Sequence, residues 1–186
     1  MKKVLAASLL ALAAGVAGAE DLDKPRLLVA SPQLEGLYSR TALLVVPMQG
    51  QHVGFILNRA TDLKLATLFP EHAPSAKVAE PLYFGGPEMA GAIFAMVRRD
   101  PGGQSMALFD DVFVTANEKA VDEIIEKRPN DARYFAGFVG WRPGELEKEV
   151  ESGFWHVADP DVATVFSKDT KALWEVLVMR FRKGYI

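Results

Sequence analysis

At 186 residues, with 49% hydrophobic and 24% charged side chains, the chain is long enough for one domain with a sizeable apolar core. It contains no cysteine, which excludes disulfides and thiolate chemistry. The formal net charge of −3 argues against the global positive field that drives binding to nucleic-acid phosphates.

The N-terminus has the three parts of a secretory signal peptide. Lys2 and Lys3 form a basic start, residues 4–16 are apolar, and Ala17-Gly18-Ala19 resembles a cleavage site. The alternatives are an uncleaved anchor or an alanine-rich helix, but the apolar run is short for a membrane span, and no later segment is long and apolar enough. We therefore predict cleavage after Ala19 and a periplasmic location. Removing Lys2 and Lys3 lowers the number of lysines and arginines from 21 to 19, while the number of aspartates and glutamates stays 24, so the mature net charge is −5.

Short apolar runs bounded by glycine, proline and polar turns predict strands along the mature chain. The predicted strands are residues 27–30, 41–46, 52–57, 82–84, 92–97, 106–109, 112–115, 133–139 and 155–157. Pro47 is expected to end the second strand, and the glycine-containing turn at residues 49–51 predicts a hairpin. Residues 71–80 are expected to form a polar loop.

Helical periodicity and capping residues predict a smaller number of helices. They are expected at residues 63–69, from Asn117 to Pro129, at residues 145–151, at residues 161–166 as a short helix or turn, and after a cap at Asp169 or Thr170. Strands in runs, rather than in regular alternation with helices, indicate an α+β fold with much antiparallel pairing. We predict a single domain over residues 24–186.

Four segments of the chain are similar, in the same order, to segments of the YqgE/AlgH family. They read LLVASPQL, HVGFILNR, YFGGP and GFVGWRPGELEKEV, and the pattern from Gly137 to Glu147 is the most distinctive. The resemblance covers nearly the whole mature chain and implies a single α+β domain with a mostly antiparallel, branched or partly barrel-like sheet flanked by helices. It implies no reaction, because none is established for the family. The chain departs from the family pattern at Ala60, where proline is usual, at Glu145, where glutamine is usual, and in its leader.

Asn58 and Arg59 directly follow a predicted strand, a position where side chains often converge on a ligand. Arg59 could bind a carboxylate or phosphate through its guanidinium fork. The structural alternative, which we favour, pairs Arg59 with a carboxylate such as Glu147 and uses Asn58 to cap a turn. Similarly, Gly85-Gly86-Pro87 could present backbone N–H groups to an anion, but paired glycines more often permit a tight turn or close backbone approach.

The predicted helix at residues 145–151 carries four glutamates. Two of them could form an acid–base pair, although a solvated acidic face with one structural glutamate is the simpler interpretation. Trp141 and Trp155 could form a binding platform or could anchor the core. The three histidines lack the spacing of a metal site or catalytic triad, and we expect neither metal nor cofactor. The candidate binding groove comprises Asn58, Arg59, Gly85, Gly86, Pro87, Trp141, Gly144, Glu145 and Glu147.

The leader, the acidic charge and the lack of a catalytic constellation favour a non-enzymatic periplasmic accessory or binding protein. Its partner would be an envelope protein or a small anionic ligand, and nucleic acid is not expected. One alternative is a small-molecule hydrolase that uses Glu145 or Glu147 with Arg59. The other is a transcriptional regulator, which only the family name suggests and which the charge and the leader disfavour.

Overall fold

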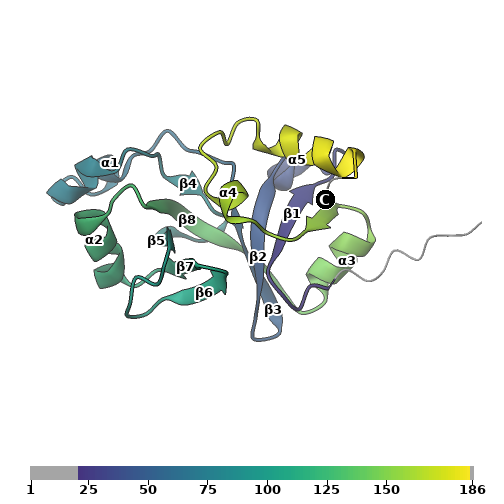
Figure 1. The fold of residues 1–186 in the computed structure, drawn as a ribbon, viewed down its shortest axis with the longest axis horizontal. Helices are drawn as coiled ribbons and strands as arrows, with labels where there is room; N and C mark the ends of the chain where they lie inside the picture. The colour runs from purple at the N-terminus through teal and green to yellow at the C-terminus, as the bar shows by residue number, and fades with distance from the viewer. Residues whose placement is uncertain (1–20, 185–186) are drawn as a thin grey trace, which may run out of the picture.

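Nine strands form one curled, half-barrel sheet in the computed structural model, which describes residues 21–184 (Figure 1). The strand order is β6-β7-β5-β8-β3-β2-β1-β9, and all of these neighbours are antiparallel; β4 pairs with β8 in parallel. The strands are β1 Arg26–Ala30, β2 Ala42–Met48, β3 Gln51–Ile56, β4 Tyr83–Phe84, β5 Glu88–Arg98, β6 Met106–Phe109, β7 Val112–Thr115, β8 Ala132–Trp141 and β9 Trp155–Ala158. The predicted leader and its cleavage after Ala19 lie outside the described residues.

Five helices and two short 3-10 helices surround this sheet (Figure 1). The helices are α1 Leu65–Leu68, α2 Glu118–Lys127, α3 Glu145–Glu151, α4 Val162–Val165 and α5 Leu173–Arg182, and the 3-10 helices are η1 Gly36–Tyr38 and η2 Ala73–Lys77. Within residues 21–184, no helix combines the length and apolar character needed to span a membrane. The predicted single α+β domain with a mostly antiparallel, partly barrel-like sheet is confirmed.

Three apolar clusters hold the sheet and helices together. The concave face of the sheet packs around an aromatic group that includes Phe55 and Phe135, and α4 and α5 close it with Val165 and Leu177. On the convex side, α3 covers the β1–β3 half through Leu146, while α1 and α2 cover the β5–β8 half. Strand β8 contributes to all three clusters because it joins the two halves.

Two strands extend beyond the ends that we expected. Pro47 lies inside β2, beyond Val45, the last β2 residue that pairs with β1, and proline is tolerated at such an edge. Strand β8 passes Gly137, whose φ of 67° lies at the point where the register with β5 shifts. This glycine forms a bulge that bends β8 and lets it continue to Trp141.

Two smaller expectations also need correction. The predicted polar loop at residues 71–80 contains η2, which begins with Pro74 in its first turn. Helix α5 begins at Leu173 and has Ala172 as its N-cap, so neither Asp169 nor Thr170 is its cap; Asp169 instead accepts a hydrogen bond from the Ala172 N–H.

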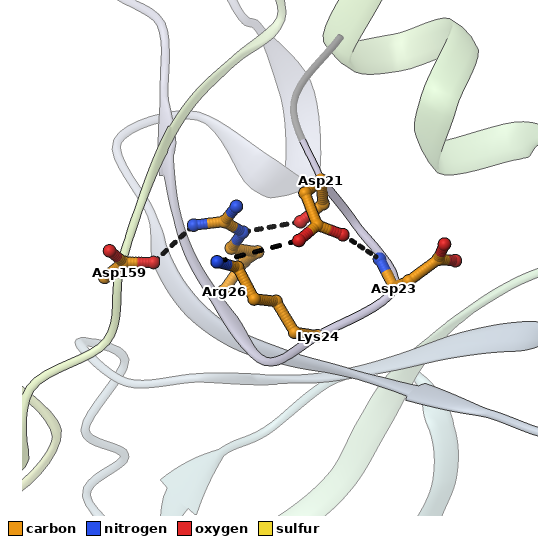
Figure 2. A network of polar contacts seen from close by, with 5 residues as sticks. All are labelled: Asp21, Asp23, Lys24, Arg26 and Asp159. Carbon is orange, nitrogen blue, oxygen red and sulfur yellow. Dashed lines mark hydrogen bonds and ion pairs between the residues drawn. The ribbon is translucent and has the colours of Figure 1, made fainter.

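The first described residues are bound to the sheet by a polar network (Figure 2). The Arg26 guanidinium donates to the backbone oxygen of Asp21 at 2.6 Å and pairs with the Asp159 carboxylate. Leu22 is buried, and its carbonyl lies 3.0 Å from His52 Nε2. The chain therefore has specific tertiary contacts from Asp21 onward, two residues after the predicted cleavage position.

Candidate functional site

Asn58 has a structural role at the C-terminal end of β3. Its Oδ1 accepts from the Ala42 N–H and its Nδ2 donates to the Arg40 carbonyl, both at 2.9 Å. The side chain therefore joins the end of β3 to the start of β2, as the capping alternative predicted. Arg59, the next residue, is half-buried and donates to the Ser39 carbonyl at 3.3 Å.

Glu147 does not pair with Arg59. Its Oε1 lies 3.9 Å from Nδ1 of the buried His52, and neither this Nδ1 nor Glu147 Oε2 has a hydrogen-bond partner in the structure. His52 lies near the start of β3 and Arg59 follows its end, so several residues of roughly 3.3 Å each separate the two sites. The pairing that we favoured from the sequence is wrong, and the structure does not bring Glu147 and Arg59 together.

Gly85 and Gly86 permit close backbone packing. A Cβ atom on Gly85 would lie 2.2 Å from the Gly137 carbonyl oxygen, and one on Gly86 would lie 2.1 Å from the Phe138 carbonyl carbon. The Gly85 N–H donates to Ala136 at 2.9 Å, so it is not free to bind an anion. Close approach, the simpler of the two interpretations, explains these buried glycines. The following Pro87 is exposed.

Trp141 and Trp155 are core anchors that share one acceptor. Both indoles are 4% exposed, and both donate their Nε1–H to Glu149 Oε2, at 2.9 and 2.8 Å. Glu149 is thus the glutamate of α3 that anchors the core. Glu145 is exposed and accepts from the Arg142 N–H, and Gly144, with φ of 78°, provides the left-handed residue before the helix. The candidate groove thus consists of residues with capping and packing roles, and their binding of a ligand stays a prediction.

A concave site that the sequence did not indicate lies where β5 ends and β7 and β8 begin. A cavity of about 400 Å³ is bounded there by these strand ends, by the segment before β4 and by the segment after α4. We call it the cationic pocket. Its charged lining residues are the cations Arg98, Arg99, Arg128, Arg133 and Lys168 and the carboxylates Glu80, Asp111 and Asp131. Five cations and three carboxylates give a local charge of +2 in a chain whose total is −3.

Arg133 forms the buried base of the cationic pocket. Its side chain is 2% exposed, and it donates to the carbonyls of Val165 and Leu57, the latter at 2.7 Å. The guanidinium also lies 4.0 Å from the ring centre of Tyr83, a cation–π contact. Burial lowers the pKa of Arg133, although arginine stays protonated at neutral pH.

One donor of Arg133 remains without an acceptor. Its Nε is buried and makes no hydrogen bond within residues 21–184, and the Glu80 Oε2 atom lies 3.9 Å away. A buried N–H without an acceptor costs about 1–3 kcal/mol. An anion that entered the pocket and displaced Glu80 could satisfy it.

Three cations at the rim complete the pocket. Arg99 has an unusual φ of 73° and is fixed by its N–H bond to the Asp111 carbonyl at 2.6 Å. Arg128 follows the last turn of α2, and Lys168 is exposed after α4. Within residues 21–184, none of these three forms an ion pair within 4.0 Å, whereas Arg98 lies 3.7 Å from the Asp111 carboxylate. The pocket therefore combines a buried cation with rim cations that have no ion-pair partner, an arrangement suited to anions.

Sequence reasoning missed this pocket because its charged residues lie between positions 80 and 168 and share no motif. One local signal was present. Arg133 stands inside the apolar run that forms β8, and a cation in a buried strand requires partners from elsewhere in the fold. Its neighbours, however, come from α4, from β4 and the segment before it, and from the residue that follows β3, and no local pattern indicates them.

A second hollow of about 360 Å³ lies on the concave face of the sheet. It is mostly apolar and includes Phe55, Phe94 and Phe138. None of the buried polar atoms that lack a partner in residues 21–184 belongs to a residue lining it. In the same part of the chain, no three histidine, aspartate or glutamate side chains are grouped to hold a metal ion.

Comparisons with known proteins extend over nearly the whole described chain. A family model described as AlgH-like (DUF179) matches residues 27–185. A UPF0301 protein from Chlorobium limicola is 33% identical over 161 residues, which cover 83% of this chain and 84% of that protein. A UPF0301 protein from Chlorobium luteolum is 31% identical over 155 residues, 80% of each chain.

Two solved structures share the fold. The solution structure of AlgH from Pseudomonas aeruginosa superposes with a TM-score of 0.71 at 20% identity, covering 90% of this chain and 92% of that one. Protein DIP2367 from Corynebacterium diphtheriae gives 0.69 at 24% identity, covering 86% of each. At these identities the likeness shows the fold alone. Taken with the family model and the Chlorobium relatives, it leads to one conclusion: this chain belongs to the AlgH-like family, whose function is uncharacterised.

Proposed function

We propose that this protein is exported and acts without catalysis, by binding a small anionic ligand in the cationic pocket. The observation that carries the proposal is Arg133, a buried guanidinium whose Nε has no acceptor at the base of a cavity with four further cations. Burying an arginine is costly, and an anion bound beside it offsets part of that cost. A positively charged cleft with low-dielectric walls also concentrates anions from solution.

The pocket lining supports binding rather than hydrolysis. None of the described residues that line it is a serine, threonine, cysteine or histidine, so the wall lacks the hydroxyl or thiol nucleophile and the imidazole base that many hydrolases use. The hydrolase alternative required Glu145 or Glu147 to act with Arg59, and the contacts of Glu147 are with His52 instead. Arginines and a lysine are suited to hold an anion in place.

The leader pattern supports export. Cleavage after Ala19 would leave Asp21 and its contacts with Arg26 intact, because the first tertiary contact of the described chain is made by Asp21 (Figure 2). Expression of the full chain in a Gram-negative host, followed by fractionation and intact-mass measurement, tests this part. We expect a periplasmic species that begins at Glu20. A full-length cytoplasmic product would contradict it.

Anion binding is tested by calorimetric titration of the mature protein with inorganic phosphate at constant ionic strength. We expect saturable binding at one site, weakened about tenfold or more by Lys168→Ala or Arg99→Asn, since a hydrogen bond to a charged group contributes roughly 1.5–3 kcal/mol. Asparagine is chosen at position 99 because it tolerates the left-handed conformation.

Arg40→Asn is the matched control for Arg99→Asn. Arg40 is also exposed and left-handed, with φ of 56°, but it does not line the pocket. Its replacement should leave phosphate binding unchanged. Absence of saturable anion binding to the wild-type protein, or equal weakening by Arg40→Asn, would refute the proposed function.

A further inference from the structure

We infer that the ligand of the cationic pocket is a phosphate monoester of a small organic group, an inference that rests on the proposed anion-binding function. The first argument is charge. Arg98 is near Asp111, at 3.7 Å, and Arg133 is near Glu80, at 3.9 Å, so the charge of each of these two cations is largely neutralised by its neighbouring carboxylate. The remaining charges are three cations and one carboxylate, a net charge of +2.

The second argument is the number of unpaired donors. Arg99, Arg128 and Lys168 have no ion-pair partner within 4.0 Å among residues 21–184. A phosphate monoester presents three strong acceptor oxygens and carries a charge close to −2 at neutral pH. It therefore matches both the number of unpaired cations and their excess charge, whereas a monocarboxylate matches neither.

The third argument is size. A cavity of about 400 Å³ falls within the range of small-molecule sites and exceeds the space that a phosphate group alone would fill. Phe166 and Ala132 contribute apolar wall. An organic group attached to the phosphate would cover this wall, so the ester should bind more tightly than inorganic phosphate.

The test compares phenyl phosphate with phenyl sulfate by calorimetric titration of the mature protein. The two probes have the same ring and three terminal oxygens, but near pH 7.5 the sulfate carries one negative charge and the phosphate carries nearly two. We expect phenyl phosphate to bind at least tenfold more tightly than phenyl sulfate, inorganic phosphate or the dicarboxylate succinate. Arg99→Asn should remove most of this preference and Arg40→Asn should not.

Repeating the titration near pH 5 separates the charge of the probe from its shape. The phosphate monoester is then largely a monoanion, because its second pKa is about 6, so the preference over phenyl sulfate should shrink. The pocket itself cannot cause this loss: no histidine lines it, and protonation of Glu80, Asp111 or Asp131 would only strengthen anion binding.

The outcomes distinguish this inference from the proposed function. If phenyl sulfate or succinate binds as tightly as phenyl phosphate, the inference of a phosphate monoester is wrong, but the proposed anion binding stands. If inorganic phosphate binds as tightly as phenyl phosphate, the inference that the ligand carries an organic group is wrong. If none of the four anions binds saturably, both the inference and the proposed function are refuted.

Discussion

The carboxylate of Glu149 should be a major contributor to the stability of the fold, since it accepts both buried indole N–H groups. Replacing Glu149 with alanine leaves the Nε1–H groups of Trp141 and Trp155 without acceptors in a site where both rings are 4% exposed. A hydrogen bond to a charged group contributes roughly 1.5–3 kcal/mol, so losing two should lower the free energy of unfolding by about 3–6 kcal/mol. That is a large part of the 5–15 kcal/mol that is typical of a whole domain.

Urea unfolding followed by tryptophan fluorescence measures this effect. With a slope of roughly 2 kcal/mol per molar urea, the midpoint of Glu149→Ala should fall by about 1.5–3 M. Glu149→Gln keeps an acceptor oxygen and should lose only the charge-assisted part, roughly 1 kcal/mol. Glu151→Ala, at an exposed glutamate on the same helix, is the matched control and should change stability by less than about 0.5 kcal/mol. A Glu149→Ala midpoint equal to that of the control would refute the reasoning.

Three further predictions concern packing and pH. Gly86→Ala should prevent folding or lower the free energy of unfolding by more than about 4 kcal/mol, because its Cβ would lie 2.1 Å from the Phe138 carbonyl carbon. Gly91→Ala is the control and should be tolerated, because the space around its Cβ is open. Thermal unfolding compares the two variants, and similar melting temperatures would contradict the close approach. Burial, the largest cause in each case, raises the pKa of Tyr38, Tyr83 and Tyr134. The unfolded chain then loses these protons from about pH 10 while the folded chain keeps them, so the contribution of the tyrosines to stability should be constant below about pH 10 and fall above it. Urea midpoints that do not decrease at about pH 11 would argue against buried phenols. Burial, and to a lesser extent the charge of Arg182, lower the pKa of His156. Stability should therefore fall as the pH drops below about 6.5, because the unfolded chain binds a proton there that the folded chain does not bind. His156→Gln should reduce this dependence of stability on pH, and an unchanged dependence would assign it to other groups.

Local sequence signals were sufficient for elements whose ends are set by nearby residues. Strands β6 and β7 have the predicted limits, and Asn117 caps α2 by accepting from the Ala120 N–H, as expected. Where the limits depend on distant neighbours, prediction failed. Pro47 does not end β2 because β1 has already stopped pairing there, and β8 runs past the predicted end at Val139 to Trp141, which pairs with His52 of β3.

The candidate site shows the same contrast between features set by nearby residues and features set by distant ones. Asn58 as a cap and the tryptophans as core anchors could be predicted from residue type and position. The partner of Glu147 could not, because His52 lies far from it in sequence. The cationic pocket needed the complete fold, since its walls come from the ends of β5 and β8 and from the segments beside β4 and α4.

The central claim is that an anion binds at the base of the cationic pocket, and the most direct measurement observes the Arg133 Nε–H group itself. A proton–nitrogen correlation NMR spectrum of the mature protein resolves arginine Nε–H signals, and phosphate can be titrated in at constant ionic strength. We predict a saturable shift of the Arg133 signal, accompanied by Arg99 and Arg128, while Arg40 stays unchanged. An Arg133 signal that does not move, or shifts that are equal at Arg40, would contradict the account.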